Sequence, residues 1–263
     1  MDRPDLEPLL RYWRAQDEVF DRVAPSWWGA VVSDPRYPRV QEPNYARVET
    51  EQPVRLAEVE EALLPEMARC GVRRSHVVVF RPQEQTDLVV EASTRGAQLL
   101  WDLVMEHSGA TGSDHDPRVE EVQVFDGAFW RGHRESLAWF DVTDAGIVEE
   151  IAAIERDLLI PAGRRWFTIR QDGAFVAFAA LLVLEGVGYI DHVVTFPQAR
   201  RRGYASALAR HASSESATAG AERTYLLAER DGPATALYEG IGFRPVTTIA
   251  SWVSEIENDA VRT

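Results

Sequence analysis

Three arginines followed by a glycine form the part of this sequence best suited to bind an anion. Residues 196–208 read FPQARRRGYASAL, within a chain of 263 residues whose formal net charge is -14. The residues after the glycine favour a helix, and the start of a helix presents unpaired N–H groups and the positive end of the helix dipole. Gly203 and Ala205 are small enough to let a ligand approach the backbone, and the arginines can add charge-assisted hydrogen bonds. The stretch therefore predicts a site for a diphosphate, although it lacks the G-x-x-x-x-G-K-[ST] pattern of a P-loop.

The segments on either side of the arginines give them a context that a charge run alone lacks. All 28 basic residues of the chain are arginines, so the arginine type by itself carries little information, and a charge run is commonly solvated surface. Before the run lies the apolar stretch HVVTFP, which favours a strand, and after one more helix and strand comes DGPATALYEGIGF. There Ala234, Leu237 and Tyr238 have helical spacing, and Gly242 followed by Phe243 fits a helix C-terminal cap.

Taken in this order, VVTFP, RRRGYA and A-x-x-L-Y-x-x-x-G-F resemble the GCN5-related N-acetyltransferases, the GNAT superfamily, over residues 121–253. In that family the amides of the loop bind the diphosphate of acetyl-CoA, the preceding strand pairs with the pantetheine arm, and the tyrosine protonates the departing thiolate. The resemblance implies an α/β (α+β) GNAT fold, with a mixed and mostly antiparallel twisted sheet flanked by helices. It also implies an acyltransferase that moves an acetyl group from acetyl-CoA to the amine of a small molecule or a protein by direct attack, without a metal.

The resemblance implies a cofactor site along one strand, the arginine loop and the helix that carries the tyrosine. Tyr238 becomes the expected catalytic acid. Seven residues earlier, where the family often has asparagine, this chain has Asp231, so a side-chain contact with the cofactor there would depart from the family pattern. The residues expected at the cofactor are Val193, Val194, Thr195, Arg200, Arg201, Arg202, Gly203, Tyr204, Ala205, Ser206, Asp231 and Tyr238.

Acetyl transfer to an amine needs an oxyanion donor, an acid and a path for the amine proton. A backbone N–H near Val194 or Thr195, at the end of the strand, can stabilise the oxyanion. The phenol of Tyr238, with an ordinary pKa near 10, can donate a proton to a thiolate whose conjugate acid has a pKa near 8.5. Asp191 is expected to relay the amine proton, because two-residue alternation puts it on the same face of the strand as Thr195. His192 is the alternative.

The first half of the sequence repeats the order of elements found around the arginines. A helix over 54–70, the strand SHVVVF, a helix over 83–95 and the strand QLLWDLVME parallel the helix over 204–217, the strand TYLLAE, the helix over 233–240 and the closing strand. The loop TEQPVR before the first of these helices has Glu51 and no glycine, so it would repel a diphosphate. We therefore expect a degenerate GNAT-like domain over 1–110 and an active N-acetyltransferase domain over 118–255. An unrelated α/β extension is the alternative for the first half.

The charge and composition of the chain argue against several other classes of function. A net charge of -14 argues against nucleic-acid binding, which needs a basic face. No apolar run approaches the roughly 18 residues of a membrane span, and the charged N-terminus does not read as a secretory signal, so a cytoplasmic protein is expected. The expected oligomeric state is a monomer or a homodimer. Cys70, the only cysteine, is expected to be a buried small residue and not a nucleophile. The alternative to an enzyme is a non-catalytic CoA-binding sensor or scaffold protein.

Overall fold

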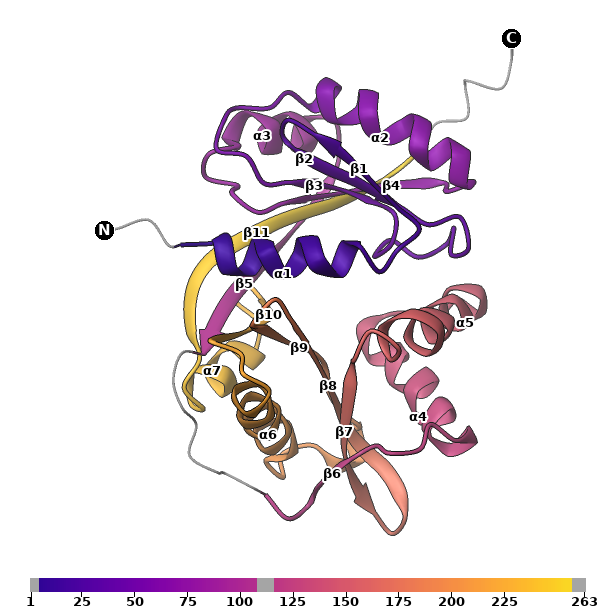
Figure 1. Cartoon of the computed structure of the whole chain (residues 1–263), viewed down its shortest axis with the longest axis vertical. Coiled ribbons are helices and arrows are strands. Elements are labelled where there is room, and N and C mark those ends of the chain that lie inside the picture. The colour runs from indigo at the N-terminus through magenta and orange to yellow at the C-terminus, as the bar shows by residue number, and fades with distance from the viewer. Residues whose placement is uncertain (1–4, 108–115, 257–263) are drawn as a thin grey trace. The chain divides into compact units, whose positions relative to one another are not determined.

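The computed structural model describes residues 5–107 and 116–256, which form two compact units, each built from two stretches of the chain (Figure 1). The C-terminal unit comprises Met1–Gln16 and Leu103–Thr247, and the N-terminal unit comprises Asp17–Asp102 and Thr248–Thr263. Residues 108–115, between the two domains expected from the sequence, lie outside the described residues. The division into domains over 1–110 and 118–255 stays a prediction.

The C-terminal unit is a sheet with helices on both faces. Its strand order is β10-β9-β8-β7-β6, in which β9 and β10 are parallel and the other neighbours are antiparallel. The elements are α1 (Glu7–Asp17, of which Asp17 falls in the other unit), β6 (Val119–Glu121), α4 (Gly127–Leu137), a 3-10 turn η1 (Ala138–Phe140), α5 (Ala145–Ile154), a π-helical turn η2 (Glu155–Leu159), β7 (Arg165–Gln171), β8 (Ala174–Leu184), β9 (Val187–Thr195), a 3-10 turn η3 (Pro197–Ala199), α6 (Tyr204–Thr218), β10 (Arg223–Glu229) and α7 (Ala234–Glu239). This mixed and mostly antiparallel sheet flanked by helices confirms the expected fold class.

Two tight turns set the register of the three central strands. Asp172 and Gly173, between β7 and β8, both have positive φ (51° and 79°), and so do Glu185 and Gly186 between β8 and β9 (50° and 71°). Positive φ at both central residues is the type I′ geometry that matches the twist of a hairpin. An Asp-Gly pair favours this turn, so the first hairpin follows from its own local sequence.

The two faces of this sheet have different cores. Helix α6 packs on one face, where Leu208 and Ala212 join Ile190 and Phe167 in one apolar cluster. Helix α4 covers the other face, where Phe129 belongs to a mainly aromatic cluster. Figure 1 shows α6 on one side of these strands and α4 with α5 on the other. The strands that position the site are thus held from both sides.

Helix α1, at the start of the chain, also belongs to this unit. The ring of Tyr12 stacks on that of Tyr189 in β9, with ring centroids 5.2 Å apart, and Trp13 meets the same ring edge-on at 5.8 Å. Aromatic pairs in these arrangements stabilise beyond the area they bury. The N-terminal helix therefore supports β9, the strand that carries the expected site.

Gly188 in β9 is the point where α6 approaches the sheet most closely. A Cβ on Gly188 would lie 1.9 Å from the hydroxyl oxygen of Ser216. We expect Gly188→Ala to lower the free energy of unfolding by about 1–3 kcal/mol, the usual cost of overpacking a core. Chemical denaturation checks this, with Gly127→Ala in α4 as the control, because Gly127 has open space around it. Equal stability of the two variants would contradict the close packing of α6 on β9.

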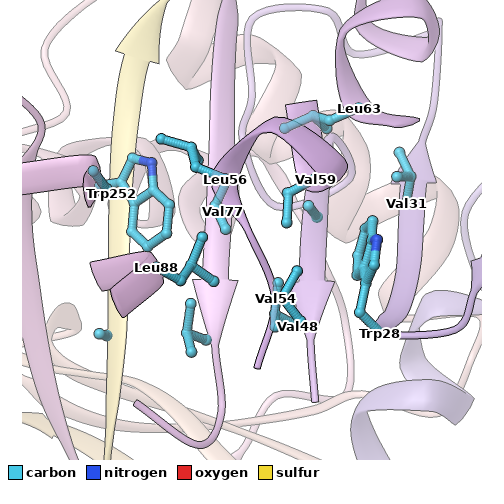
Figure 2. Packing of buried hydrophobic residues seen from close by; sticks show 14 of the residues in the cluster. Trp28, Val31, Val48, Val54, Leu56, Val59, Leu63, Val77, Leu88 and Trp252 are labelled. Carbon is cyan, nitrogen blue, oxygen red and sulfur yellow. The ribbon is translucent and has the colours of Figure 1, made fainter. Parts of the chain in front are cut away.

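The N-terminal unit is a second sheet covered by two helices. Its elements are β1 (Arg22–Ser26), β2 (Gly29–Ser33), β3 (Tyr45–Val48), α2 (Leu56–Cys70), β4 (Arg74–Val79) and α3 (Thr86–Thr94), with residues 98–102 of β5 (Gln98–His107) and 248–255 of β11 (Arg244–Glu255). Figure 2 shows its core, in which Leu56, Val59 and Leu63 of α2 lie over the strands between Trp28 and Trp252. Cys70 is buried in the same cluster, as its sequence position predicts.

The order of elements repeats between the two units. The series β3-α2-β4-α3-β5 matches β9-α6-β10-α7-β11, and in each series the first two strands pair in parallel. The closing strand of each series continues into the other unit. Residues 250–255 of β11 pair with 74–79 of β4 in the N-terminal unit, and Glu106 of β5 accepts hydrogen bonds from Arg223 and Tyr225 in the C-terminal unit.

Candidate active site

Strands β9 and β10 separate part-way along their length. They pair only from Val187 to Tyr189 and from Arg223 to Tyr225 in the described chain, although β9 runs on to Thr195 and β10 to Glu229. Beyond this point the edge of β9 that faced β10 is left without a strand partner. An open edge of this kind offers main-chain hydrogen bonds to an extended ligand.

A bulge in β9 sits at this opening. The pairing of β9 with β8 shifts register between Phe178 and Ala180, and His192 has a φ of +52°. A positive φ is uncommon outside glycine, and bulges of this kind are enriched next to active sites. Past the bulge, the N–H of Phe196 donates to Val176 in β8. Because backbone groups alternate along a strand, the N–H groups of Thr195 and Val193 then point to the opened side.

The arginine loop leads directly from β9 into α6. Arg201 and Gly203 both have positive φ (64° and 76°), and Gly203 caps the helix without a side chain. The first helical bond runs from the N–H of Ala207 to Gly203, which leaves the amides of the preceding residues without intrahelical acceptors. Amides exposed in this way form an anion-binding concavity at the positive end of the helix dipole.

The three arginines do not all have the same environment. Arg200 donates from Nε to the carbonyl of Thr195 at 3.1 Å, and its guanidinium lies over the ring of Trp139 at 5.2 Å. Arg201 and Arg202 are exposed and make no ion pair or hydrogen bond with any described residue. Arg200 therefore anchors the loop to the end of β9, and the other two are available to an anion. Sequence reasoning missed Arg118, whose guanidinium lies 5.2 Å over the ring of Tyr204 at the same helix end.

Tyr238 in α7 is buried, and its hydroxyl has no hydrogen-bond partner among the described residues. Burial, with the negative charge of Asp191 as the second cause, raises the pKa of Tyr238 to about 12. The phenol is therefore protonated throughout the neutral range. The charge of Asp191 thus acts on the pKa of Tyr238, although the two expected catalytic residues lie 47 positions apart in sequence.

Asp191 is held by an ion-pair network that sequence reasoning missed. Arg164 donates to Oδ2 of Asp191 at 2.7 Å and also to Glu155 of the π-helical turn, while Trp166 donates to Glu155 at 3.1 Å. Oδ1 of Asp191 accepts the backbone N–H of His192 at 2.7 Å. Burial alone would raise the pKa of Asp191, but the charge of Arg164 and these hydrogen bonds lower it, so the carboxylate is ionised.

His192, the alternative proton acceptor, is neutral, and its ring packs against Trp166 on the α4 side of the sheet. Asp191 lies on that side too, because it pairs with Ala180, so the bulge breaks the alternation that was expected to put Asp191 on the face of Thr195.

The Nε2 atom of His192 lies 2.6 Å from the hydroxyl of Ser136, whose single hydrogen goes to the carbonyl of His133. Nε2 of His192 is therefore the donor of this bond, and only Nδ1 can accept a proton. Burial lowers the pKa of His192 to about 4. The ring stacks on that of His133, which is fully buried and has its pKa lowered to about 2, again chiefly by burial.

The remaining expected residues lie on different sides of β9. The side chains of Val193 and Tyr204 pack against the α6 cluster that also contains Tyr238. Val194 lies instead in the aromatic cluster under α4. Asp231 is exposed at the turn between β10 and α7, with a φ of +66°. The hydroxyl of Thr195 is buried and has no hydrogen-bond partner, so the end of β9 retains a polar atom that a ligand could satisfy.

The equivalent loop of the N-terminal unit is closed by the protein's own side chains. The buried amide of Gln85 accepts from the N–H of Val54 and donates to the carbonyls of Thr50 and Gln52. At the start of α2, the backbone N–H groups of residues 55 and 56 donate to the carboxylates of Glu58 (3.1 Å) and Glu91 (3.4 Å). Carboxylates thus already occupy the helix N-terminus that a diphosphate would need.

The described part of the chain contains neither a membrane-spanning helix nor a cluster of metal ligands. No helix there is long and apolar enough to cross a membrane. Within the same residues, no three His, Cys, Asp or Glu side chains come together in a way that could hold a metal ion.

Solved structures share this fold. A functionally unknown conserved protein from Staphylococcus epidermidis has a TM-score of 0.69 at 10% identity, over 90% of this chain and 95% of that protein. A GCN5-related N-acetyltransferase from Kribbella flavida has a TM-score of 0.60 at 17% identity, over 95% and 97%. A tandem GNAT protein from the clavulanic acid biosynthesis pathway has a TM-score of 0.51 at 12% identity, over 75% and 70%. At these identities the likeness establishes the GNAT fold alone, and no curated protein matches the chain.

The family match falls on the part of the chain that contains the opened strand, the arginine loop and the tyrosine helix. Residues 132–243 match the model of the acetyltransferase (GNAT) family. The resemblance seen in the three sequence motifs is thereby confirmed for residues 132–243, the part of the chain that matches the acetyltransferase (GNAT) family.

Proposed function

We propose that the C-terminal unit transfers the acetyl group of acetyl-CoA to an amine by direct attack, with Tyr238 as the acid and Asp191 as the carboxylate that receives the amine. The observation that carries this proposal is Tyr238 itself, a buried phenol whose hydroxyl has no hydrogen-bond partner among the described residues and whose pKa is raised to about 12. Acetyl transfer in general follows from the family, whereas the donor and the acceptor are part of the proposal.

The donor groups around the opening fit acetyl-CoA. The amides at the start of α6, together with Arg201 and Arg202, suit a diphosphate, and the small Gly203 leaves room for it. The free edge of β9 after Tyr189 suits the amides of an extended pantetheine arm. When bound, acetyl-CoA supplies an activated acyl group on a thioester. Asp231 is proposed to contact it only at the rim, because its side chain is exposed.

Each of the proposed site residues has one role in the reaction. The N–H of Thr195 or Val193, on the open edge of β9, donates to the carbonyl oxygen as negative charge develops there. Asp191 attracts the ammonium of the acceptor and passes its proton to water, since its lowered pKa makes it a weak base. The freed amine nitrogen forms the C–N bond as the C–S bond breaks. Tyr238 donates its phenolic proton to the leaving sulfur and regains a proton from the second one that the nitrogen loses as the amide forms.

A CoA-binding sensor or scaffold remains the alternative function. The free hydroxyl of Tyr238 favours the enzyme, because a pure binding site has no need of a buried phenol without a partner. A cytoplasmic location, a monomeric or homodimeric state and the absence of nucleic-acid and membrane partners stay predictions.

The test of cofactor binding is thermal unfolding with and without acetyl-CoA for wild type and Gly203→Glu. A ligand present at 100 times its Kd adds about 2.7 kcal/mol of stability, so we expect a clear upward shift of Tm in wild type. The glutamate places a negative charge in the anion loop and should abolish the shift. Gly173→Glu is the matched control, because Gly173 also has positive φ and open space but lies in the β7–β8 hairpin. A shift in Gly203→Glu equal to that in wild type would exclude this loop as the diphosphate site.

A further inference from the structure

Two exposed aromatic side chains stand next to each other in the C-terminal unit. Trp139 and Phe140 of η1 are 48% and 47% exposed, and the other large apolar side chain that is strongly exposed in the described part of this unit is Val124. A single exposed apolar residue needs no explanation, but an exposed adjacent pair of rings marks a surface that binds something apolar.

One ring contacts the strand that carries the expected chemistry, and the other contacts the loop that follows it. The ring of Phe140 lies 5.0 Å from that of His192, the bulge residue whose N–H binds Asp191. The ring of Trp139 lies 5.2 Å from the guanidinium of Arg200, which binds the carbonyl of Thr195. The two rings therefore lie near the C-terminal end of β9 and the loop after it, where the acyl transfer is proposed to occur.

Two carboxylates lie near these rings, Glu155, whose pKa is raised by burial, and the ionised Asp191. Arg164 is the single cation that pairs with both Glu155 and Asp191. The side chains of Arg164 and Glu155 are only 5% and 6% exposed, whereas that of Asp191 is 39% exposed. The carboxylate open to a ligand is thus that of Asp191, whose neighbour His192 contacts Phe140, and the ammonium group of a ligand can pair with it.

We infer from this juxtaposition that the acceptor is a small primary amine carrying an aromatic or bulky apolar group, its ammonium at Asp191 and its apolar group against Phe140 and Trp139. The inference rests on the proposed function and names its substrate class. A polyamine would need a second anionic partner and an amino sugar would need polar partners for its hydroxyls, and the two rings supply neither.

The experiment compares amines of different size and polarity. The full chain with saturating acetyl-CoA is assayed for thiol release with 2-phenylethylamine, ethanolamine, spermidine and a lysine-containing peptide. We expect kcat/KM for 2-phenylethylamine to exceed the others about 10- to 100-fold, the range that an apolar pocket gives. Phe140→Ala should remove most of that preference through the amine KM and leave the KM for acetyl-CoA unchanged. Phe140→Leu should retain part of it, and Val124→Ala is the control for loss of an exposed apolar side chain.

Each outcome decides the inference. Equal rates with ethanolamine or spermidine, a peptide as the best acceptor, or an unchanged preference in Phe140→Ala would each overturn it. If no amine turns over, calorimetric titration of 2-phenylethylamine into the protein saturated with CoA separates the two proposals. Binding that is lost in Phe140→Ala supports the apolar amine site while the transferase function fails. No binding in wild type overturns the amine site as well.

Discussion

Tyr238→Phe is expected to lower kcat about 10²- to 10⁴-fold while the Tm shift given by acetyl-CoA remains. The substitution removes one oxygen that has no hydrogen-bond partner within residues 5–107 and 116–256, so packing against Phe243 is kept and only the proton donor is lost. Steady-state thiol release gives kcat, and thermal unfolding with the ligand gives binding. Tyr225→Phe is the matched control, since the hydroxyl of Tyr225 binds Glu106 and is not proposed to act in the reaction.

The raised pKa of Tyr238 also makes a prediction about stability. The folded protein keeps the phenol protonated up to a pKa of about 12, whereas in the unfolded chain it ionises near 10. Wild type should therefore lose stability relative to Tyr238→Phe as the pH rises from 10 to 12, and show no such difference below 10. An unchanged kcat in Tyr238→Phe would remove this residue from the acid role, and the sensor function would then be the better account.

What the sequence could predict was local. The Asp-Gly hairpin, the helix start at the arginine loop and the glycine stop after Cys70 each depend on a few adjacent residues whose backbone preferences are strong. The strand β1 was missed, because its sequence RVAPS has no two-residue alternation and contains Pro25. Local patterns also cannot assign partners, so nothing in the sequence indicated that β5 and β11 each continue from one unit into the other.

The chemistry was predicted where it follows from a motif and missed where it follows from tertiary contacts. Tyr238 and Asp191 were selected by resemblance and strand alternation. Glu155 and Arg164 were not, because charged residues are normally exposed and these two are buried only through each other. The helical pattern of the sequence before β7 gives no sign that residues 155–159 form a π-helical turn, the feature that carries Glu155. Such turns occur frequently at functional sites, but only coordinates reveal them.

Arg164→Met is expected to have the largest effect on stability, a loss of about 3–5 kcal/mol in the free energy of unfolding. The substitution removes the one guanidinium that pairs with both Glu155 and Asp191. Asp191 then loses the partner of its charge, and the buried Glu155, whose pKa burial raises, loses a hydrogen-bond donor. Arg165→Met is the matched control. Arg165 also pairs with two carboxylates, Glu121 and Glu215, but its side chain is 33% exposed, so its loss should cost about 1 kcal/mol or less. Denaturant unfolding at neutral pH measures both.

The same substitution should move the acid limb of the rate profile. In wild type Arg164 offsets the burial of Asp191 and holds its pKa below the usual value, so the carboxylate stays ionised as the pH falls. Without Arg164 burial dominates and the pKa of Asp191 rises, so kcat/KM should begin to fall at a higher pH than in wild type. Arg164→Met/Glu155→Gln should recover part of the stability, because one buried charge is removed, while the acid limb stays displaced. An acid limb at the wild-type position in the folded single variant would mean that Asp191 does not act in its ionised form, and the amine proton would then have to pass by another group.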